Sequence, residues 1–246
     1  SGYLLPLLAF ALMYRRWQKK GKDPSGRSVI PVEYEAPDKL TPLEVGYLVH
    51  QKFSKDYVSA ELVYLASRGY ISIREIKKEG FISDSFDYEL RVKKDWTSDS
   101  MLAAHDVTIL NGIFGGGTSV LISSLKQKFY KTQVAVAKDV RNCVVDERSY
   151  FVEDPVMAAN KYRGLAIALF VLAFFLPLPI SYRISIVLSG VVVFLFAFIM
   201  PKRTPKGVEA WQQSLGFKEY LEMAETNRVK WEEKENLFFK FLPYAM

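Results

Sequence analysis

Two long apolar runs dominate the hydrophobic pattern of the chain. Gly164–Ile180 and Ile184–Met200 carry no charged residue, and each run is 17 residues long. Only Ser181, Tyr182 and Arg183 separate them. A membrane-spanning helix needs about 17–25 residues, so the pattern predicts a transmembrane helical hairpin that turns at these three residues. Two buried core helices of a soluble protein would show the same pattern, but they would need cover on every face.

The distribution of basic residues indicates how this hairpin is oriented. Basic side chains flank both outer ends of the hairpin, whereas its tip carries Arg183 alone; the flanking residues are Lys161, Arg163, Lys202, Arg203 and Lys206. Positive residues favour the cytoplasmic side of a membrane. We therefore expect a multi-pass protein of the cell membrane, with segments 15–163 and 204–246 in the cytoplasm. Pro177 and Pro179 lie where the first helix should end, because proline disrupts a helix interior.

A shorter apolar run opens the chain. Ser1–Tyr14 has no basic residue before it, and five follow it within a few positions: Arg15, Arg16, Lys19, Lys20 and Lys22. The run is too short to cross a bilayer by itself. We interpret it as the end of a truncated transmembrane helix whose flank agrees with the orientation above.

Between these apolar segments the pattern predicts helices first and strands second. Thr41-Pro42-Leu43-Glu44 is a capping box with proline at the first helical position, which indicates a helix start. A second helix places Val58, Leu62, Leu65 and Ala66 at helical spacing, and Gly69 is suited to end it. Beyond this glycine, residues 71–74 and 86–92 alternate between apolar and polar, which predicts a pair of strands. Helix, helix and a two-stranded wing is a winged-helix-like order.

The remaining segments predict further helices. We expect a helix around Ala103–Phe114, a glycine turn at Gly115–Gly117, a short helix near Ser119–Phe129 and a longer one from Lys131 to Arg148. After the hairpin, two amphipathic helix faces are expected; they consist of Phe217, Tyr220, Leu221 and Ala224, and of Leu237, Phe238, Phe241 and Leu242. These helices would pack on the soluble domains or lie on the membrane surface.

Together these elements predict an α+β fold with winged-helix-like cytoplasmic units and a transmembrane helical hairpin. The expected segments are the helix end at 1–14, a linker at 15–39, a winged-helix-like unit at 40–96, a second unit at 97–160 that is helical or winged-helix-like, the hairpin at 161–203 and amphipathic helices at 204–246.

The charge balance argues against a nucleic-acid-binding surface. The chain carries a formal charge of +6, but residues 15–163 hold 24 Lys and Arg against 20 Asp and Glu, a net charge of +4. A nucleic-acid footprint is normally larger and clustered. The helix Tyr57–Arg68, which would read DNA in a winged helix, contains Glu61 and has Arg68 as its one basic residue. We therefore expect at most weak, non-specific binding to nucleic acid.

The residues that usually carry catalysis or bind metals are scarce. His50 and His105 are the two histidines and Cys143 is the single cysteine, and each lies in a different predicted element. We interpret His50 and Cys143 as structural residues of apolar helix faces. Gly115–Gly117 lacks the Gly-Lys-Ser/Thr ending of a phosphate loop. We therefore predict no catalytic residue, no cofactor, no bound metal and no enzymatic activity.

Six stretches spread along the chain resemble the YciQ-like family of predicted bacterial membrane proteins, which contains a domain of unknown function, DUF2207. The matching stretches are Gly21–Pro24, Leu40–Leu48, Leu65–Ile71, Arg203–Gly207, Gly216–Leu221 and Leu242–Ala245. The resemblance implies an extracytoplasmic domain upstream and further hydrophobic sequence downstream. The family offers no established activity, so it supplies no site residues.

Two hypotheses for function follow from the sequence. In the first, the cytoplasmic winged-helix-like domains form a protein-interaction or signalling module, whose partners are the lipid bilayer and a protein. In the second, the chain is a membrane-tethered DNA-binding transcription regulator. The weak and dispersed positive charge favours the first. The oligomeric state is not indicated by the sequence.

Overall fold

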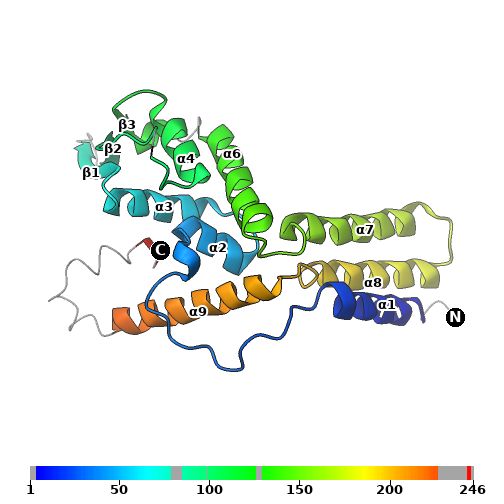
Figure 1. Ribbon diagram of the computed structural model, residues 1–246. Coiled ribbons are helices and arrows are strands. Elements are labelled where there is room, and N and C mark those ends of the chain that lie inside the picture. The colour runs from blue at the N-terminus through cyan, green and yellow to red at the C-terminus, as the bar shows by residue number, and fades with distance from the viewer. Residues whose placement is uncertain (1–3, 79–84, 98, 126–128, 227–242, 245–246) are drawn as a thin grey trace. The chain divides into compact units, whose positions relative to one another are not determined.

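The computed structural model describes residues 4–78, 85–97, 99–125, 129–226 and 243–244. Within them the fold is α+β and mostly helical, with one three-stranded sheet. The chain divides into two compact units (Figure 1). The first unit contains Ser1–Ser28 and Glu147–Gln212, and the second contains Val29–Asp146 and Gln213–Met246. The sequence-based boundaries divide the chain more finely, and they place 40–96 and 97–160 in separate units.

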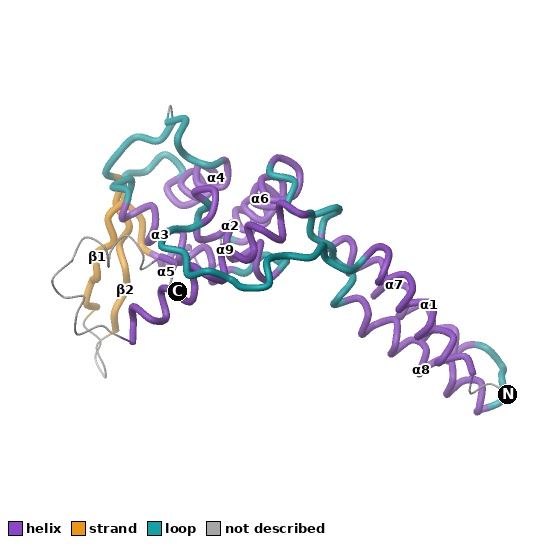
Figure 2. The backbone as a smooth tube through the Cα atoms, turned by 60° about the horizontal axis from the view of Figure 1, so that its bottom comes forward, coloured by secondary structure: helices purple, strands orange, loops and turns teal. Residues whose placement is uncertain are grey.

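The first unit is a bundle of helices. Its members are α1 (Leu4–Lys20), α7 (Pro155–Phe175), α8 (Ile180–Ala197) and the beginning of α9 (Pro205–Thr226). In both Figure 1 and Figure 2 the helices α1, α7 and α8 lie side by side. A buried cluster joins them through Met13 of α1, Ala166 of α7 and Val193 of α8. Large apolar side chains outside this cluster, such as Phe174 at 78% exposure, face outward.

The connection between α7 and α8 differs from the predicted one. The turn lies at residues 176–179, whereas Ser181–Arg183 belong to the first turn of α8. The amides of Tyr182 and Arg183 both donate to the carbonyl of Pro179 at the start of α8. A proline is compatible with a helix start because no helical amide is required there. The prolines therefore end α7, as predicted, and also set an earlier start for α8.

Two of the stretches that carry the family resemblance meet in the first unit. Asp23 pairs with the buried Arg203 guanidinium at 3.1 Å, and its other oxygen accepts the Arg203 amide at 2.6 Å. A little further along, Gly207 lies directly against the backbone of Tyr150, and a Cβ at this glycine would overlap the Tyr150 carbonyl oxygen. A side chain larger than hydrogen would therefore push α9 away from this segment.

The second unit holds the sheet and the remaining helices. Its elements are η1 (Pro37–Lys39), α2 (Pro42–His50), α3 (Lys55–Ser67), β1 (Ile71–Lys78), β2 (Ser85–Val92), α4 (Ala104–Phe114), β3 (Ser119–Leu121), α5 (Ile122–Leu125), α6 (Tyr130–Arg141) and the end of α9. A π-helical turn, η2 (Asn142–Glu147), continues α6. The strands are antiparallel in the order β1-β2-β3, with Ile73 opposite Leu90 and Leu90 opposite Val120.

Several local predictions for this unit are confirmed. The capping box is present at the start of α2, where the Thr41 amide donates to Glu44 Oε2 at 2.9 Å. Gly69 adopts a left-handed conformation with φ of 79° directly after α3, so the chain can turn into β1. The predicted strand pair is β1 and β2, and the helix predicted at Ala103–Phe114 is α4.

Other local predictions need correction. The predicted short helix at Ser119–Phe129 begins as strand β3, because residues 119–121 pair with β2 before helix α5 starts. In β2, the acidic Asp87 is buried, since its carboxylate accepts hydrogen bonds from the Ser123 amide and hydroxyl. Phe86 on the opposite face is exposed. The α3 face is also shifted: Glu61 is fully buried, whereas Leu62 is half-buried.

The structure describes only part of the predicted C-terminal helices. The first amphipathic face belongs to α9, where Phe217 is buried and Tyr220 and Leu221 are half-buried. The second predicted face, at Leu237–Leu242, lies outside the described residues.

Candidate functional site

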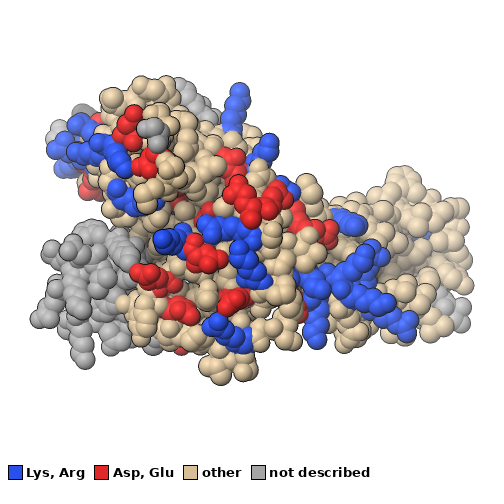
Figure 3. Space-filling view, viewed as in Figure 1, with Lys and Arg blue, Asp and Glu red and all other residues tan. Residues whose placement is uncertain are grey.

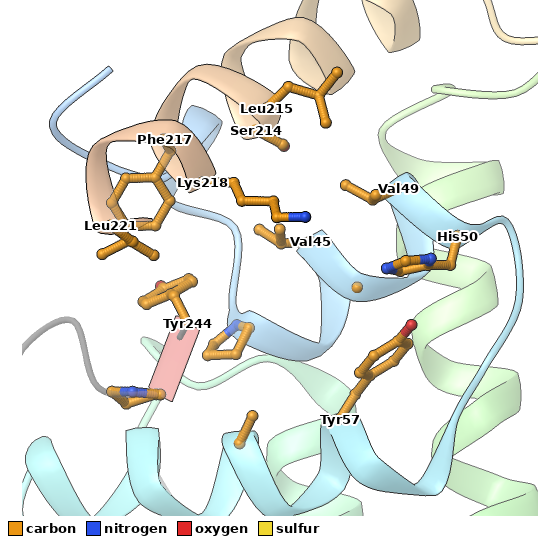
Figure 4. Close-up of a pocket in the computed structure, with 14 residues that line it drawn as sticks. Val45, Val49, His50, Tyr57, Ser214, Leu215, Phe217, Lys218, Leu221 and Tyr244 are labelled. Carbon is orange, nitrogen blue, oxygen red and sulfur yellow. The ribbon is translucent and has the colours of Figure 1, made fainter. Parts of the chain in front are cut away.

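A surface groove in the second unit combines apolar walls with a few polar groups. It has a volume of about 340 Å³ and lies between α2, α3, the end of α9 and residues 243–244 (Figure 4). Its apolar lining includes Val45, Val49, Phe217 and Leu221, and its polar lining includes His50, Tyr57, Lys218 and Tyr244. Ligand sites are typically concave and largely apolar with a few placed polar groups. This groove is therefore the candidate functional site.

The helices come close enough to form the groove because α2 carries a glycine. Gly46 packs directly against the ring of Tyr57 on α3, and a Cβ at this position would lie 2.7 Å from a ring carbon. The Tyr57 ring in turn stacks on His50 at the end of α2, with ring centres 5.8 Å apart. His50 is exposed, so it belongs to the groove rim and not to the buried face of its helix.

The rim near His50 is electropositive. Burial, and then the charges of Lys218 and Lys52, lower the pKa of His50 below its ordinary value. The imidazole is therefore neutral at neutral pH, and the lysines supply the positive charge. Figure 4 shows the Lys218 side chain reaching from α9 across the groove toward α2. The positive potential at this end of the groove favours an acidic group in a ligand.

The other end of the groove is aromatic. Tyr244 donates a hydrogen bond from its hydroxyl to the Leu40 carbonyl at 2.9 Å. Its ring meets those of Phe217 and Tyr64 edge-on, with centres 5.2 Å and 6.0 Å away. Burial raises the pKa of Tyr244 above its ordinary value, so the hydroxyl remains a donor. Tyr244 therefore closes this end of the groove with a fixed aromatic wall.

A buried carboxyl cluster lies beside the start of α2, and we define it by Glu61, His105 and Asp106. All three side chains are fully buried. Glu61 Oε2 accepts the Leu43 amide at 2.8 Å in the first turn of α2, and Asp106 Oδ2 accepts the Ala103 amide at 3.2 Å at the start of α4. Carboxylates are stabilised at helix N-termini by free amides and by the helix dipole. The first turns of α2 and α4 therefore stabilise the carboxylates of Glu61 and Asp106 inside the same buried region.

This cluster contains unsatisfied atoms. Glu61 Oε1, Asp106 Oδ1 and His105 Nδ1 have no hydrogen-bond partner among the described residues. His105 uses its other nitrogen, which lies 3.1 Å from the Thr41 hydroxyl. Burial, and then the charge of Asp106, raises the pKa of Glu61 well above its ordinary value. A proton on Glu61 would supply the missing donor between the two carboxyl groups.

The same three residues could also hold a metal ion. Each offers one ligand atom, and these atoms lie within 4.8 Å of one another. Two carboxylates and one imidazole form a donor set that zinc accepts. The prediction that no metal is bound stays a prediction. A shared proton is the simpler occupant, because it satisfies two of the three unpartnered atoms and requires no further ligand.

Glu61→Gln is expected to make the protein relatively more stable as the pH rises. Because the folded pKa of Glu61 is raised, its stabilising contribution is complete below the unfolded pKa of about 4.3 and is lost as the pH rises toward the folded pKa. Glutamine cannot ionise, and its amide can still donate to Asp106. Thermal unfolding of the full chain in detergent is measured from mildly acidic to mildly alkaline pH. The melting temperature of the variant should rise relative to that of the wild type as the pH increases.

Glu219→Gln is the matched control, because Glu219 is exposed in the same unit. Its difference from the wild type should not grow with pH. A bound metal would give a different result: Glu61→Gln would then lower the melting temperature at neutral pH and reduce the metal content measured by mass spectrometry.

The structure places the other chemically suggestive residues away from the groove. The half-buried Cys143 donates its thiol hydrogen to Glu44 Oε1 at 2.8 Å, so it contacts a polar partner besides the core. Gly115 ends α4 in a left-handed conformation, which agrees with a turn.

Comparison with known proteins identifies the family. A family model described as "Predicted membrane protein (DUF2207) C-terminal domain" matches residues 31–246. The chain belongs to this family. No curated protein and no solved structure matches it.

Membership in the DUF2207 family agrees with the composition of the first unit. Among the described helices, α7 and α8 are long and apolar enough to cross a membrane. Apolar side chains of α1, α7 and α8 are exposed in large number, which is unusual for a soluble surface. The DUF2207 match extends through the groove residues of α2, α3 and α9, so the groove belongs to the family domain.

Proposed function

We propose that this DUF2207 protein is a membrane-anchored interaction module whose second unit binds a peptide segment of a partner protein in the groove. The basic flanks of α7 and α8 support a cytoplasmic position for this unit. The order α2, α3 and the β1–β2 hairpin supports a winged-helix-like character. The activity is recognition and not catalysis.

The aromatic end of the groove is the observation that carries this proposal. Tyr244 is fixed there by its hydrogen bond to a backbone carbonyl and by two edge-on rings, so it presents an aromatic wall against which an aromatic side chain of a bound peptide can pack. Aromatic anchors in such pockets commonly dominate the binding energy of protein interfaces. The positive charge of Lys218 at the other end favours an acidic residue near the aromatic anchor.

The alternative function, DNA binding, receives less support from α3. Its basic neighbour Arg68 packs over the rings of Tyr64 and Tyr70, with distances to the ring centres of 5.5 Å and 5.6 Å. The Glu61 side chain on the same helix is buried. A recognition helix needs several side chains free to reach phosphates and base edges. These contacts favour a structural role for α3, which forms one wall of the groove.

Selection from a random peptide library on the purified full chain tests the proposal. We expect enrichment of peptides that combine an aromatic and an acidic residue. Val49→Asp should weaken their binding about tenfold or more, because it introduces a charge into the apolar wall. Lys218→Glu should weaken the acidic peptides and favour peptides with a basic residue instead.

Val134→Asp serves as the control, because Val134 is an exposed valine of α6 in the same unit and does not line the groove. It should leave peptide affinity unchanged. Equal losses for Val49→Asp and Val134→Asp, or a library without any enriched motif, would contradict the proposed function.

A further inference from the structure

A second concave feature lies in the first unit, and we call it the trough. α1 and α7 both pack against α8 but contact each other far less, so an open channel remains between them. The trough has a volume of about 1130 Å³, and the buried Val193 of α8 contributes to its floor. This volume exceeds the range of about 300–1,000 Å³ that is usual for small-molecule sites. The shape therefore suits a long ligand better than a small metabolite.

One end of the trough is strongly basic. Five cationic side chains line it: Arg15, Arg16, Lys19, Lys20 and Lys161. Figure 3 shows Lys and Arg side chains gathered on one face of this unit. All five residues are exposed, and none forms an ion pair with a carboxylate in the part of the chain that the structure describes. Their charge is therefore available to an anionic ligand.

One of these basic side chains is held in place. Arg16 Nε donates to the Tyr162 hydroxyl at 3.0 Å, and the guanidinium lies over the Tyr162 ring at 5.8 Å. This contact bridges α1 and α7 across the trough. It leaves the other guanidinium N–H groups of Arg16 for a ligand, and such planar groups match phosphate geometry.

The other end of the trough is apolar. Leu12 of α1 and Leu165 and Leu169 of α7 line it. Leu12 and Leu165 are each about half exposed or more. A free anion would use the basic end and leave these side chains in contact with water. A ligand that carries an anionic head and a hydrocarbon chain would satisfy both ends.

We propose that the trough binds an anionic phospholipid, with the phosphate at the basic end and one acyl chain along the apolar end. Basic pockets between membrane helices are a common means of holding anionic lipid headgroups. The trough lies where the basic flank of α1 and that of α7 meet the apolar part of the bundle, which is the level of the headgroups if α7 and α8 cross the bilayer. This site is separate from the peptide groove, so either can exist without the other.

Native mass spectrometry of the full chain, purified in detergent, tests the lipid site. The protein is titrated with phosphatidylglycerol and with phosphatidylcholine of identical acyl chains. We expect phosphatidylglycerol to bind more tightly. The double variant Arg16→Gln and Lys161→Gln should lower that affinity about fivefold per residue, and so about 25-fold in total. Leu165→Trp, which fills the apolar end, should weaken binding without changing the charge.

The control is the double variant Lys22→Gln and Lys202→Gln, which removes the same charge from the same unit outside the trough. Its phosphatidylglycerol affinity should change less than about twofold. Melting temperatures of all variants show whether each is folded. Equal losses in the two double variants would mean that bulk charge attracts the lipid, and would overturn the site. Equal binding of the two lipids, or displacement of phosphatidylglycerol by excess inorganic phosphate, would overturn it as well.

Discussion

Leu65→Asp is expected to unfold the second unit, whereas Leu62→Asp, three residues earlier on the same helix, should leave it folded. Leu65 is fully buried in the core of the unit, and Leu62 is half-buried. Burial of an unpaired carboxylate costs at least several kcal/mol, and a typical domain has about 5–15 kcal/mol of stability to lose. The carboxylate at position 62 can reach water, so its cost should be about 1 kcal/mol.

Thermal unfolding and limited proteolysis of the full chain in detergent measure this difference. We expect Leu65→Asp to make residues of the second unit sensitive to protease at low temperature, while Leu62→Asp behaves like the wild type. Similar losses in both variants would show that the buried face of α3 has been assigned incorrectly.

The local signals in the sequence predicted much of the fold because they act over a few residues. The Thr41–Glu44 capping box sets the start of α2, and Gly69 provides the left-handed turn after α3. The apolar runs identified α7 and α8, because an uncharged run of that length has few alternatives to a long helix. Their connection was placed a few residues too late, since hydropathy does not show that Pro179 starts a helix.

The buried face of α3 was predicted less well because helical spacing alone cannot recognise a buried acid. Val58, Glu61 and Leu65 form the buried face, although Leu62 is the more apolar residue at a similar spacing. Glu61 is accommodated because the free amide of Leu43, distant in sequence, lies at its oxygen. Asp106 offered a sequence signal at the third position after Ala103, where an acid caps a helix start.

The two candidate binding features could not be predicted because each joins distant segments. The groove forms only where Tyr244 contacts Leu40, and these two residues lie far apart in the sequence. Nothing in the spacing of either residue indicates this contact, apart from their presence in two of the family-like stretches. The trough joins Arg16 to Tyr162. The sequence revealed both basic flanks, but only the packing of α1 and α7 on α8 brings them to one site.

We expect α7 and α8 to cross the bilayer as a hairpin with both flanks in the cytoplasm, and cysteine accessibility tests this topology most directly. In a chain with Cys143→Ala, single cysteines replace Ser181 near the hairpin tip, Lys161 on the basic flank within α7, and Lys206 on the basic flank in the first turn of α9. A membrane-impermeant maleimide should label the Ser181→Cys variant in intact cells, and the Lys161→Cys and Lys206→Cys variants only after permeabilisation. Labelling of the two flanks but not the tip in intact cells would reverse the orientation. Labelling of all three only after permeabilisation would contradict the crossing itself.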